Sequence, residues 1–142
     1  MILYLDTSVL VSCYVPEGHS QNILELLQKN QEQPYISRLT EVEFYSALAM
    51  KKRNKEISQH NINIVTALFN QHLSELMYQR IYIIDTLFEK AIGFLNAYRT
   101  QLRTLDALHL ACSAAMNATL VTADKILAYS GKQLDIPTLL LG

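Results

Sequence analysis

Four acidic side chains in this chain stand where each could take part in a site for chemistry. Asp6 and Asp124 each follow a short apolar run of the kind that forms a buried strand. Glu43 and Asp106 each fall in the first turn of a predicted helix. In a parallel sheet, the helices that follow strands begin at the carboxyl edge, which is the edge where ligands bind. The four carboxylates could therefore converge there.

Converging carboxylates favour one kind of chemistry. Carboxylates a few ångströms apart raise each other's pKa when nothing pairs with them, and a divalent cation removes that repulsion. Hard oxygen ligands suit Mg²⁺ or Mn²⁺, which commonly take one or two carboxylates, keep several waters and bind substrate phosphates. The pattern is therefore consistent with a metal-dependent site that handles phosphate groups.

Each carboxylate also has a purely structural interpretation, and the local pattern leaves both open. The segment Thr40-Glu41-Val42-Glu43 fits a capping box, in which the glutamate binds the N–H of the residue that caps the helix. Asp6, Asp106 and Asp124 fit helix caps or first-turn charges favoured by the helix dipole. Asp85 shows the same local pattern, so pattern alone does not exclude it from the cluster.

The predicted helix from Leu105 to Met116 carries a further signal. Nearly every residue in it is apolar, so it should be largely buried. Its polar exceptions, Asp106, His109 and Ser113, are three and four residues apart and so share one face. They do not fit a Ser/His/Asp triad, because the serine would lie in mid-helix without the strained turn that exposes such a nucleophile. His109 by itself is interpreted as a hydrogen-bonded structural histidine.

The apolar runs and helix boundaries predict short strands that alternate with helices. Strands are expected at 2–5, 35–37, 80–84, 119–122 and 137–141, the last at an edge. Helices are expected at 7–14, 20–30, 40–53, 57–77, 85–98, 104–116 and 124–129. This alternation indicates βαβ units and an α/β fold, a three-layer α/β/α domain with a mostly parallel, roughly five-stranded sheet. Because no linker or repeat interrupts the pattern, residues 1–142 are expected to form a single domain.

Composition narrows the classes of function. Half of the residues are apolar and 18% are charged, which predicts a packed globule. The net charge of −1 provides no global positive field, so nucleic-acid binding must rest on local basic patches or a bound metal. Cys13 and Cys112 are far apart in apolar surroundings and are interpreted as buried free thiols. The four glycines are too dispersed for a phosphate-cradling loop.

Two basic segments and the apolar runs give further expectations. Arg99 and Arg103, just before the Asp106 helix, are candidates for phosphate contacts, whereas the basic run 51–55 is interpreted as a solvated helix terminus. No run approaches the ~18–20 apolar residues that a membrane span needs. The N-terminus lacks the basic region of a signal peptide. A soluble, cytoplasmic protein is therefore expected.

Four segments, in order along the chain, resemble the acidic motifs of PIN-domain nucleases. They are Leu5-Asp6-Thr7-Ser8-Val9-Leu10, Thr40-Glu41-Val42-Glu43-Phe44, Leu102-Arg103-Thr104-Leu105-Asp106-Ala107-Leu108-His109-Leu110-Ala111 and Leu120-Val121-Thr122-Ala123-Asp124. The likeness spans essentially the whole chain, and the third segment is the most specific. The toxin branch of the family, the VapC-type endoribonucleases, is the nearest likeness.

The resemblance implies a five-stranded parallel sheet sandwiched by helices and a Mg²⁺ or Mn²⁺ site formed by Asp6, Glu43, Asp106 and Asp124, with Asp85 left as a structural cap. Asp6 and Asp106 would bind the ion most directly, while Glu43 and Asp124 would complete the charge cluster and orient water. The resemblance also implies cleavage of RNA, homodimers and inhibition by a small antitoxin protein. The alternative is a catalytically silent PIN scaffold that binds RNA or protein, and the intact acidic positions favour the enzyme.

Overall fold

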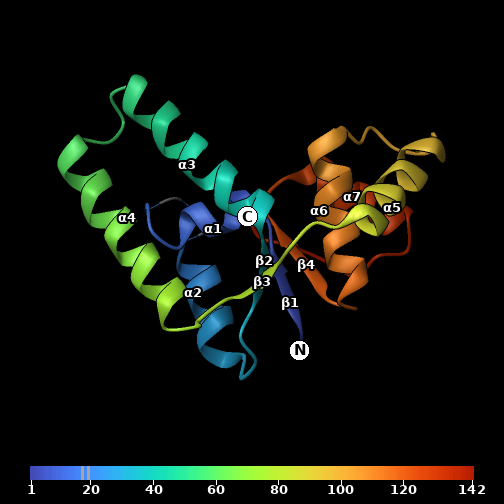
Figure 1. The fold of residues 1–142 in the computed structure, drawn as a ribbon, viewed down its shortest axis with the longest axis horizontal. Coiled ribbons are helices and arrows are strands. Elements are labelled where there is room, and N and C mark those ends of the chain that lie inside the picture. The colour runs from blue at the N-terminus through green and yellow to red at the C-terminus, as the bar shows by residue number, and fades with distance from the viewer. Residues whose placement is uncertain (17, 19) are drawn as a thin grey trace.

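The computed structural model describes residues 1–16, 18 and 20–142, and it has a parallel sheet between two layers of helices (Figure 1). The strands are β1 (Leu3–Leu5), β2 (Tyr35–Ser37), β3 (Gln79–Ile81), β4 (Thr119–Thr122) and β5 (Thr138–Leu140). The helices are α1 (Thr7–Ser12), α2 (Ser20–Lys29), α3 (Arg38–Arg53), α4 (Gln59–Ser74), α5 (Asp85–Asn96), α6 (Thr104–Ala115) and α7 (Lys125–Gln133). The predicted three-layer α/β/α fold is confirmed.

The order of the strands places the ends of β1 and β4 side by side. The sheet has the order β3-β2-β1-β4-β5, and every neighbouring pair is parallel. The chain therefore builds outward from β1 to β3 and then crosses to β4 on the other side of β1. In open sheets of this kind, ligands bind at the carboxyl ends of the strands where this reversal occurs. β5 lies at an edge, as predicted.

The alternation of side chains along β1 divides the core into two parts. Leu3 and Leu5 pack in the cluster that includes Phe44 and Phe69, while Tyr4 packs on the other face with Leu120. Since successive strand residues point to opposite faces, a wholly buried strand indicates helices on both sides. Figure 1 shows α1 to α4 beside one face and α5 to α7 beside the other.

The start of α3 differs from the prediction. The helix begins at Arg38, capped by Ser37, whose hydroxyl accepts a hydrogen bond from the Thr40 N–H at 3.2 Å. The hydroxyl of Thr40 in turn accepts from the Ser37 N–H at 3.1 Å. The capping box is thus formed by Ser37 and Thr40, and the predicted box that ended at Glu43 is wrong. Glu43 lies in the second turn of α3, where its carboxylate does not cap the helix.

The end of α7 also differs, for a reason of packing. The helix was predicted to end near Tyr129, ahead of Gly131, but it continues to Gln133. A Cβ atom on Gly131 would overlap the hydroxyl of Thr138 in β5. Glycine therefore allows α7 to lie directly against the edge strand. Within the described part of the chain, no helix is long and apolar enough to span a membrane.

Candidate active site

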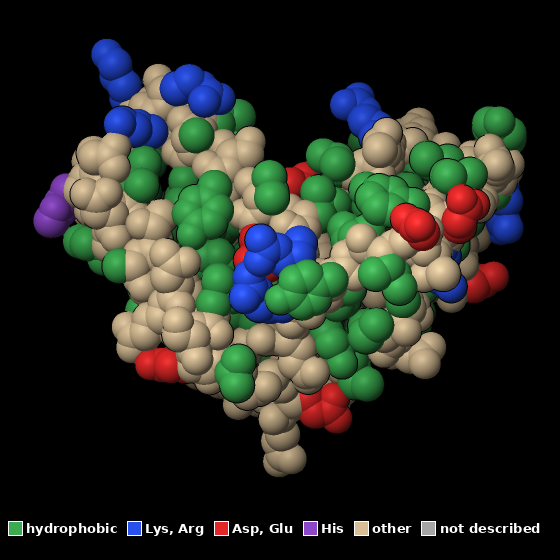
Figure 2. Space-filling model, viewed as in Figure 1, with side chains coloured by type: hydrophobic (Ala, Val, Ile, Leu, Met, Phe, Trp, Pro, Cys, Tyr) green, Lys and Arg blue, Asp and Glu red, His purple; other side chains and the backbone are tan. Residues whose placement is uncertain are grey.

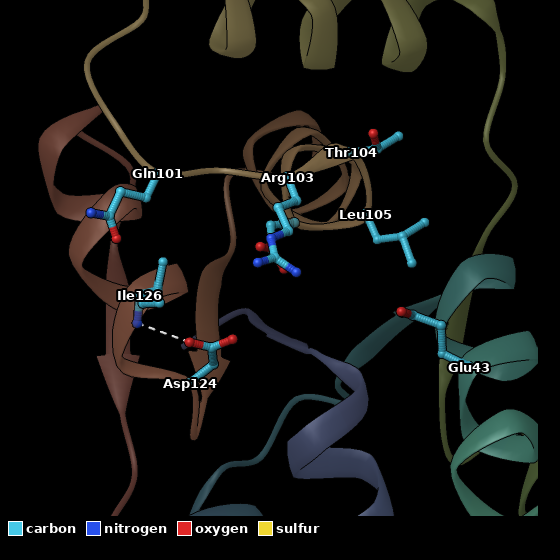
Figure 3. A pocket seen from close by; sticks show the side chains of 8 residues that line it. Glu43, Gln101, Arg103, Thr104, Leu105, Asp124 and Ile126 are labelled. Atoms are coloured by element: carbon cyan, nitrogen blue, oxygen red, sulfur yellow. Dashed lines mark hydrogen bonds between the residues drawn. The ribbon is translucent and has the colours of Figure 1, made fainter. Parts of the chain in front are cut away.

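A cleft of about 760 Å³ opens at the carboxyl edge of the sheet. Its lining includes Glu43 from α3, Asp106 near the start of α6 and Asp124 just before α7, together with Gln101, Arg103, Thr104, Leu105 and Ile126 (Figure 3). Figure 2 shows the molecular surface hollowed between the arm formed by α3 and α4 and the unit that contains α6. The structure thus brings three of the four predicted acidic residues together, from segments far apart in sequence.

Asp106 experiences the repulsion expected of converging carboxylates. It is the third residue of α6, and its side chain is partly buried. Burial raises the pKa of Asp106, and the negative charge of Asp124 raises it further, with a smaller contribution from Glu43. The Arg103 backbone N–H and the His109 side chain oppose that rise. Asp106 therefore lies in an acidic environment that favours a nearby cation.

Asp124 and Asp6 are both helix caps, as the structural interpretation predicted. One oxygen of Asp124, Oδ1, accepts from the N–H groups of Ile126 at 2.8 Å and Leu127 at 3.2 Å. Asp6 Oδ1 accepts from the Val9 N–H at 3.0 Å and caps α1. Capping accounts for one oxygen of each carboxylate, so it does not exclude a second role for either residue.

Asp6 is the most buried of the four acids and does not line the cleft. Only 4% of its surface is exposed. Burial raises the pKa of Asp6, and hydrogen bonds from Thr122 and Ser8 oppose the rise. The Thr122 hydroxyl donates to Asp6 Oδ2 and accepts from the Asp124 N–H at 3.0 Å. Through Thr122, the end of β4 joins Asp6 to the segment that carries Asp124.

Glu43 is held by two donors from other elements. The Thr7 hydroxyl lies 2.7 Å from Glu43 Oε1, and His109 Nε2 lies 2.5 Å from the same oxygen. Burial on its own raises the pKa of Glu43, but the hydrogen bonds from His109 and Thr7 outweigh it and leave the pKa lowered. Glu43 is therefore an oriented carboxylate at the wall of the cleft.

His109 connects Glu43 to the buried core. Its Nδ1 lies 2.7 Å from the hydroxyl of Tyr4, which also contacts Ser37 at 2.9 Å and Thr40 at 3.2 Å. The prediction of a hydrogen-bonded histidine is confirmed, but its link to Glu43 was not predicted. The role of Tyr4 as a hydrogen-bond partner of His109 was not predicted either. The sequence did carry a signal for it, because a tyrosine within a buried aliphatic strand needs a partner for its hydroxyl.

Asp85 and Ser113 lie apart from the site. Asp85 is the first residue of α5, but the capping position belongs to Ile84, and no side chain caps this helix by a hydrogen bond. The expectation that Asp85 is a structural cap is therefore wrong, and it does not line the cleft. Ser113 donates to the Ala118 carbonyl at 3.2 Å, so the polar face of α6 divides between the site and the end of the helix.

The donor chemistry of the cleft fits a hard divalent cation. The described part of the lining offers the carboxylates of Glu43, Asp106 and Asp124 against one cationic side chain, Arg103. Among the described residues, no three His, Cys, Asp or Glu side chains converge closely enough to enclose a metal ion. Mg²⁺ commonly binds through one or two carboxylates and keeps several waters, so an open arrangement of this kind suits it.

Comparison with known proteins places the fold. FitAcB from Neisseria gonorrhoeae has a TM-score of 0.69 and 16% identity over 98% of this chain and 96% of that one. VapC20 from Mycobacterium tuberculosis, described as a sarcin-ricin loop cleaving toxin, has a TM-score of 0.70 and 15% identity over 91% and 95%. VapBC2 from Rickettsia felis, bound to a promoter DNA fragment, has a TM-score of 0.67 and 20% identity over the full length of both chains. No curated protein matches significantly.

The sequence itself matches a family description. The PIN domain family model matches residues 3–132, which include Asp6, Glu43, Asp106 and Asp124. The matched region begins in β1 and ends in α7, so it contains the whole carboxylate cleft. This protein belongs to the PIN domain family.

Proposed function

We propose that this protein is a metal-dependent endoribonuclease and the toxin of a toxin–antitoxin pair. The observation that carries the proposal is the convergence of Glu43, Asp106 and Asp124 in one cleft at the point where the strand order reverses. Burial raises the pKa of Asp106, and the charge of Asp124 and, to a lesser extent, that of Glu43 raise it further. The repulsion between neighbouring carboxylates costs the fold free energy, whereas a site that binds a cation and a phosphate makes use of their charge.

In this proposal the four acidic residues have different roles. Asp6 and Asp106 would hold the ion, and Glu43 and Asp124 would complete the charge cluster and orient water. The chemistry that Mg²⁺ or Mn²⁺ supplies when bound is polarisation of the scissile phosphate and activation of water for in-line attack. Arg103, whose guanidinium lies over the cleft in Figure 3, is placed to contact a phosphate.

The proposed partners are RNA, a small antitoxin protein and a second copy of this chain, in the cytoplasm. Fold relatives described as a toxin–antitoxin complex from Klebsiella pneumoniae and as VapBC2 support the antitoxin. Exposed apolar side chains on α3 and α4, among them Val42, Met50, Ile64 and Leu68, support a contact surface there. Light scattering would show a mass near twice the 16.2 kDa of one chain, and a monodisperse monomer that does not gain mass with the adjacent gene product would overturn this assignment.

Cleavage of RNA tests the activity. Purified protein should cut RNA in Mg²⁺ or Mn²⁺, and the cutting should stop in EDTA and in Asp106→Asn. Asp85→Asn is the matched control, because Asp85, like Asp106, lies in the first turn of a helix but is outside the cleft. It should retain wild-type cleavage. A silent scaffold would bind RNA and leave it intact, and cleavage retained in Asp106→Asn would overturn the site.

A further inference from the structure

A second pocket, of about 630 Å³, adjoins the carboxylate cleft. Gln101 and Ile126 line both hollows, so the two are neighbours at the start of α7. Resting on the proposed function, we infer that this second pocket is a nucleotide subsite. It holds a single-stranded residue of the RNA next to the cleaved phosphodiester, with the base against Tyr98 and Tyr129 and the phosphate against Arg99 and Lys125.

The charges of the two hollows are complementary in the way that such a substrate requires. Of the residues that the structure describes, three carboxylates and one guanidinium line the cleft, whereas Arg99, Lys125 and no acidic side chain line the second pocket. RNA is a polyanion, so the acidic cleft by itself repels the strand on both sides of the phosphate that it cuts. A basic pocket beside the cleft supplies the attraction that the cleft lacks.

The aromatic residues of the pocket are exposed to an unusual degree. Tyr98 is 86% exposed and Tyr129 is 62% exposed. Neither ring is needed to fill the core, and both line the pocket. Aromatic faces beside cations are the usual means of holding single strands, because every base can stack on them. The subsite should therefore accept any base and distinguish single-stranded from paired RNA.

The walls of the pocket are fixed by local structure. The guanidinium of Arg99 donates a hydrogen bond of 2.8 Å to the Gln133 carbonyl, which ties the segment before α6 to the end of α7. Other guanidinium N–H groups remain to contact a phosphate. Lys125 and Tyr129 are four residues apart in α7 and so lie on the same side of the helix. The pocket is thus lined by a cation and an aromatic ring from α7, Lys125 and Tyr129, and by a cation and a ring from the loop before α6, Arg99 and Tyr98.

Binding of a labelled RNA without metal tests the subsite apart from catalysis. The probe is fluorescein-labelled oligo(rA) of about eight nucleotides, a length that one such site can cover, followed by anisotropy in EDTA. Tyr98→Ala and Tyr129→Ala should each weaken binding roughly 5- to 150-fold, which is the range for loss of one stacked base. Tyr98→Phe and Tyr129→Phe keep the ring and should bind as the wild type does. A duplex of the same length should bind at least as weakly as the alanine variants.

Matched substitutions elsewhere separate the subsite from general effects. Tyr82, 63% exposed and outside the pocket, provides the aromatic control as Tyr82→Ala. Lys125→Ala should reduce the slope of log K against log salt by about 0.7, the contribution of one phosphate contact on a single strand. Lys90→Ala, an exposed lysine on α5, should leave the slope unchanged.

The outcomes keep the two proposals distinct. Equal binding by Tyr98→Ala, Tyr129→Ala and Tyr82→Ala overturns the subsite. If those alanine variants also cut RNA at the wild-type rate in Mg²⁺ while Asp106→Asn does not, the proposed nuclease stands and only the subsite fails. A wild-type protein that binds the oligonucleotide through both tyrosines but never cuts RNA in metal supports the pocket and overturns the proposed nuclease.

Discussion

His109 holds Glu43 with one ring nitrogen and Tyr4 with the other: Nε2 lies 2.5 Å from Glu43 Oε1, and Nδ1 lies 2.7 Å from the tyrosine hydroxyl. An ionised glutamate only accepts hydrogen bonds, so the proton belongs on Nε2 and Tyr4 donates to Nδ1. A residue in the middle of the central strand thereby sets the tautomer of a histidine, and the histidine orients a carboxylate of the cleft. His109 is a positioning residue in this arrangement.

Substitution of His109 should separate this role from simple packing. His109→Gln retains an N–H near the position of Nε2, whereas His109→Leu keeps the volume and removes the donor. We expect His109→Leu to lower RNA cleavage roughly 10- to 100-fold, the usual cost of losing a residue that orients a ligand, and His109→Gln to recover most of it. Equal activity of the two folded variants would contradict the positioning role. A ¹⁵N spectrum should show the Nε2–H tautomer in the wild type.

The sequence predicted those parts of the site that depend on local pattern. Asp6 and Asp124 follow strands, and such residues lie at the carboxyl edge of any parallel sheet. The partners of Glu43 were not predictable in the same way, because Thr7 and His109 are 36 and 66 residues distant and meet it only through the packing of α1, α3 and α6. Side-chain hydrogen bonds between distant segments leave no periodicity in the sequence.

The start of α3 was misassigned because the chain offers two caps in succession. Ser37 and Thr40 are three residues apart, and so are Thr40 and Glu43. Both pairs fit the spacing of a capping box. In the structure the earlier pair forms the capping box, and the buried hydroxyl of Tyr4 in β1 contacts the side chains of both Ser37 and Thr40. This tertiary contact favours a helix start at Arg38, which leaves the Glu43 carboxylate available to line the cleft.

Replacement of Asp6 should distinguish a site residue from a mere cap. Burial raises the pKa of Asp6, which means that keeping this side chain ionised in the folded protein costs free energy. In EDTA, Asp6→Asn should therefore raise the thermal midpoint, since asparagine can also cap α1 and carries no charge. The same variant should lose cleavage in Mg²⁺. A cap without other function would instead show a lower or unchanged midpoint and full activity. Differential scanning fluorimetry and an RNA cleavage assay provide the two readouts.

Two helical glycines should respond to alanine in opposite directions. A Cβ atom on Gly93 in α5 meets nothing within 4 Å, so Gly93→Ala should stabilise the protein by about 0.5–1 kcal/mol through helix propensity. Gly131→Ala would drive its Cβ into the Thr138 hydroxyl and should destabilise by about 1–3 kcal/mol, the usual cost of overpacking. Urea unfolding measures both. Thr138→Ala should relieve part of the Gly131→Ala cost, and a strictly additive double variant would contradict the proposed overlap.

The two cysteines should be unreactive at neutral pH. Burial raises the pKa of Cys112 to about 11 and that of Cys13 to about 12, against an ordinary value of 9.0. A thiol whose pKa rises on folding contributes stability that is fully present below its unfolded pKa and is lost as the pH climbs through the folded value. For Cys112 that loss should fall between about pH 9 and 11, and Cys112→Ala should lack it.

The same burial should appear in the rate of chemical labelling. At pH 8, an aromatic disulfide reagent should modify neither thiol of the folded protein within the time that it takes to modify both in urea, because only the thiolate reacts. Cys112 is fully buried, whereas Cys13 is partly exposed and donates to the Val9 carbonyl at 3.4 Å. Labelling in the native state should therefore begin at Cys13. Rapid modification of Cys112 in the folded protein would show that α6 does not pack as the structure has it.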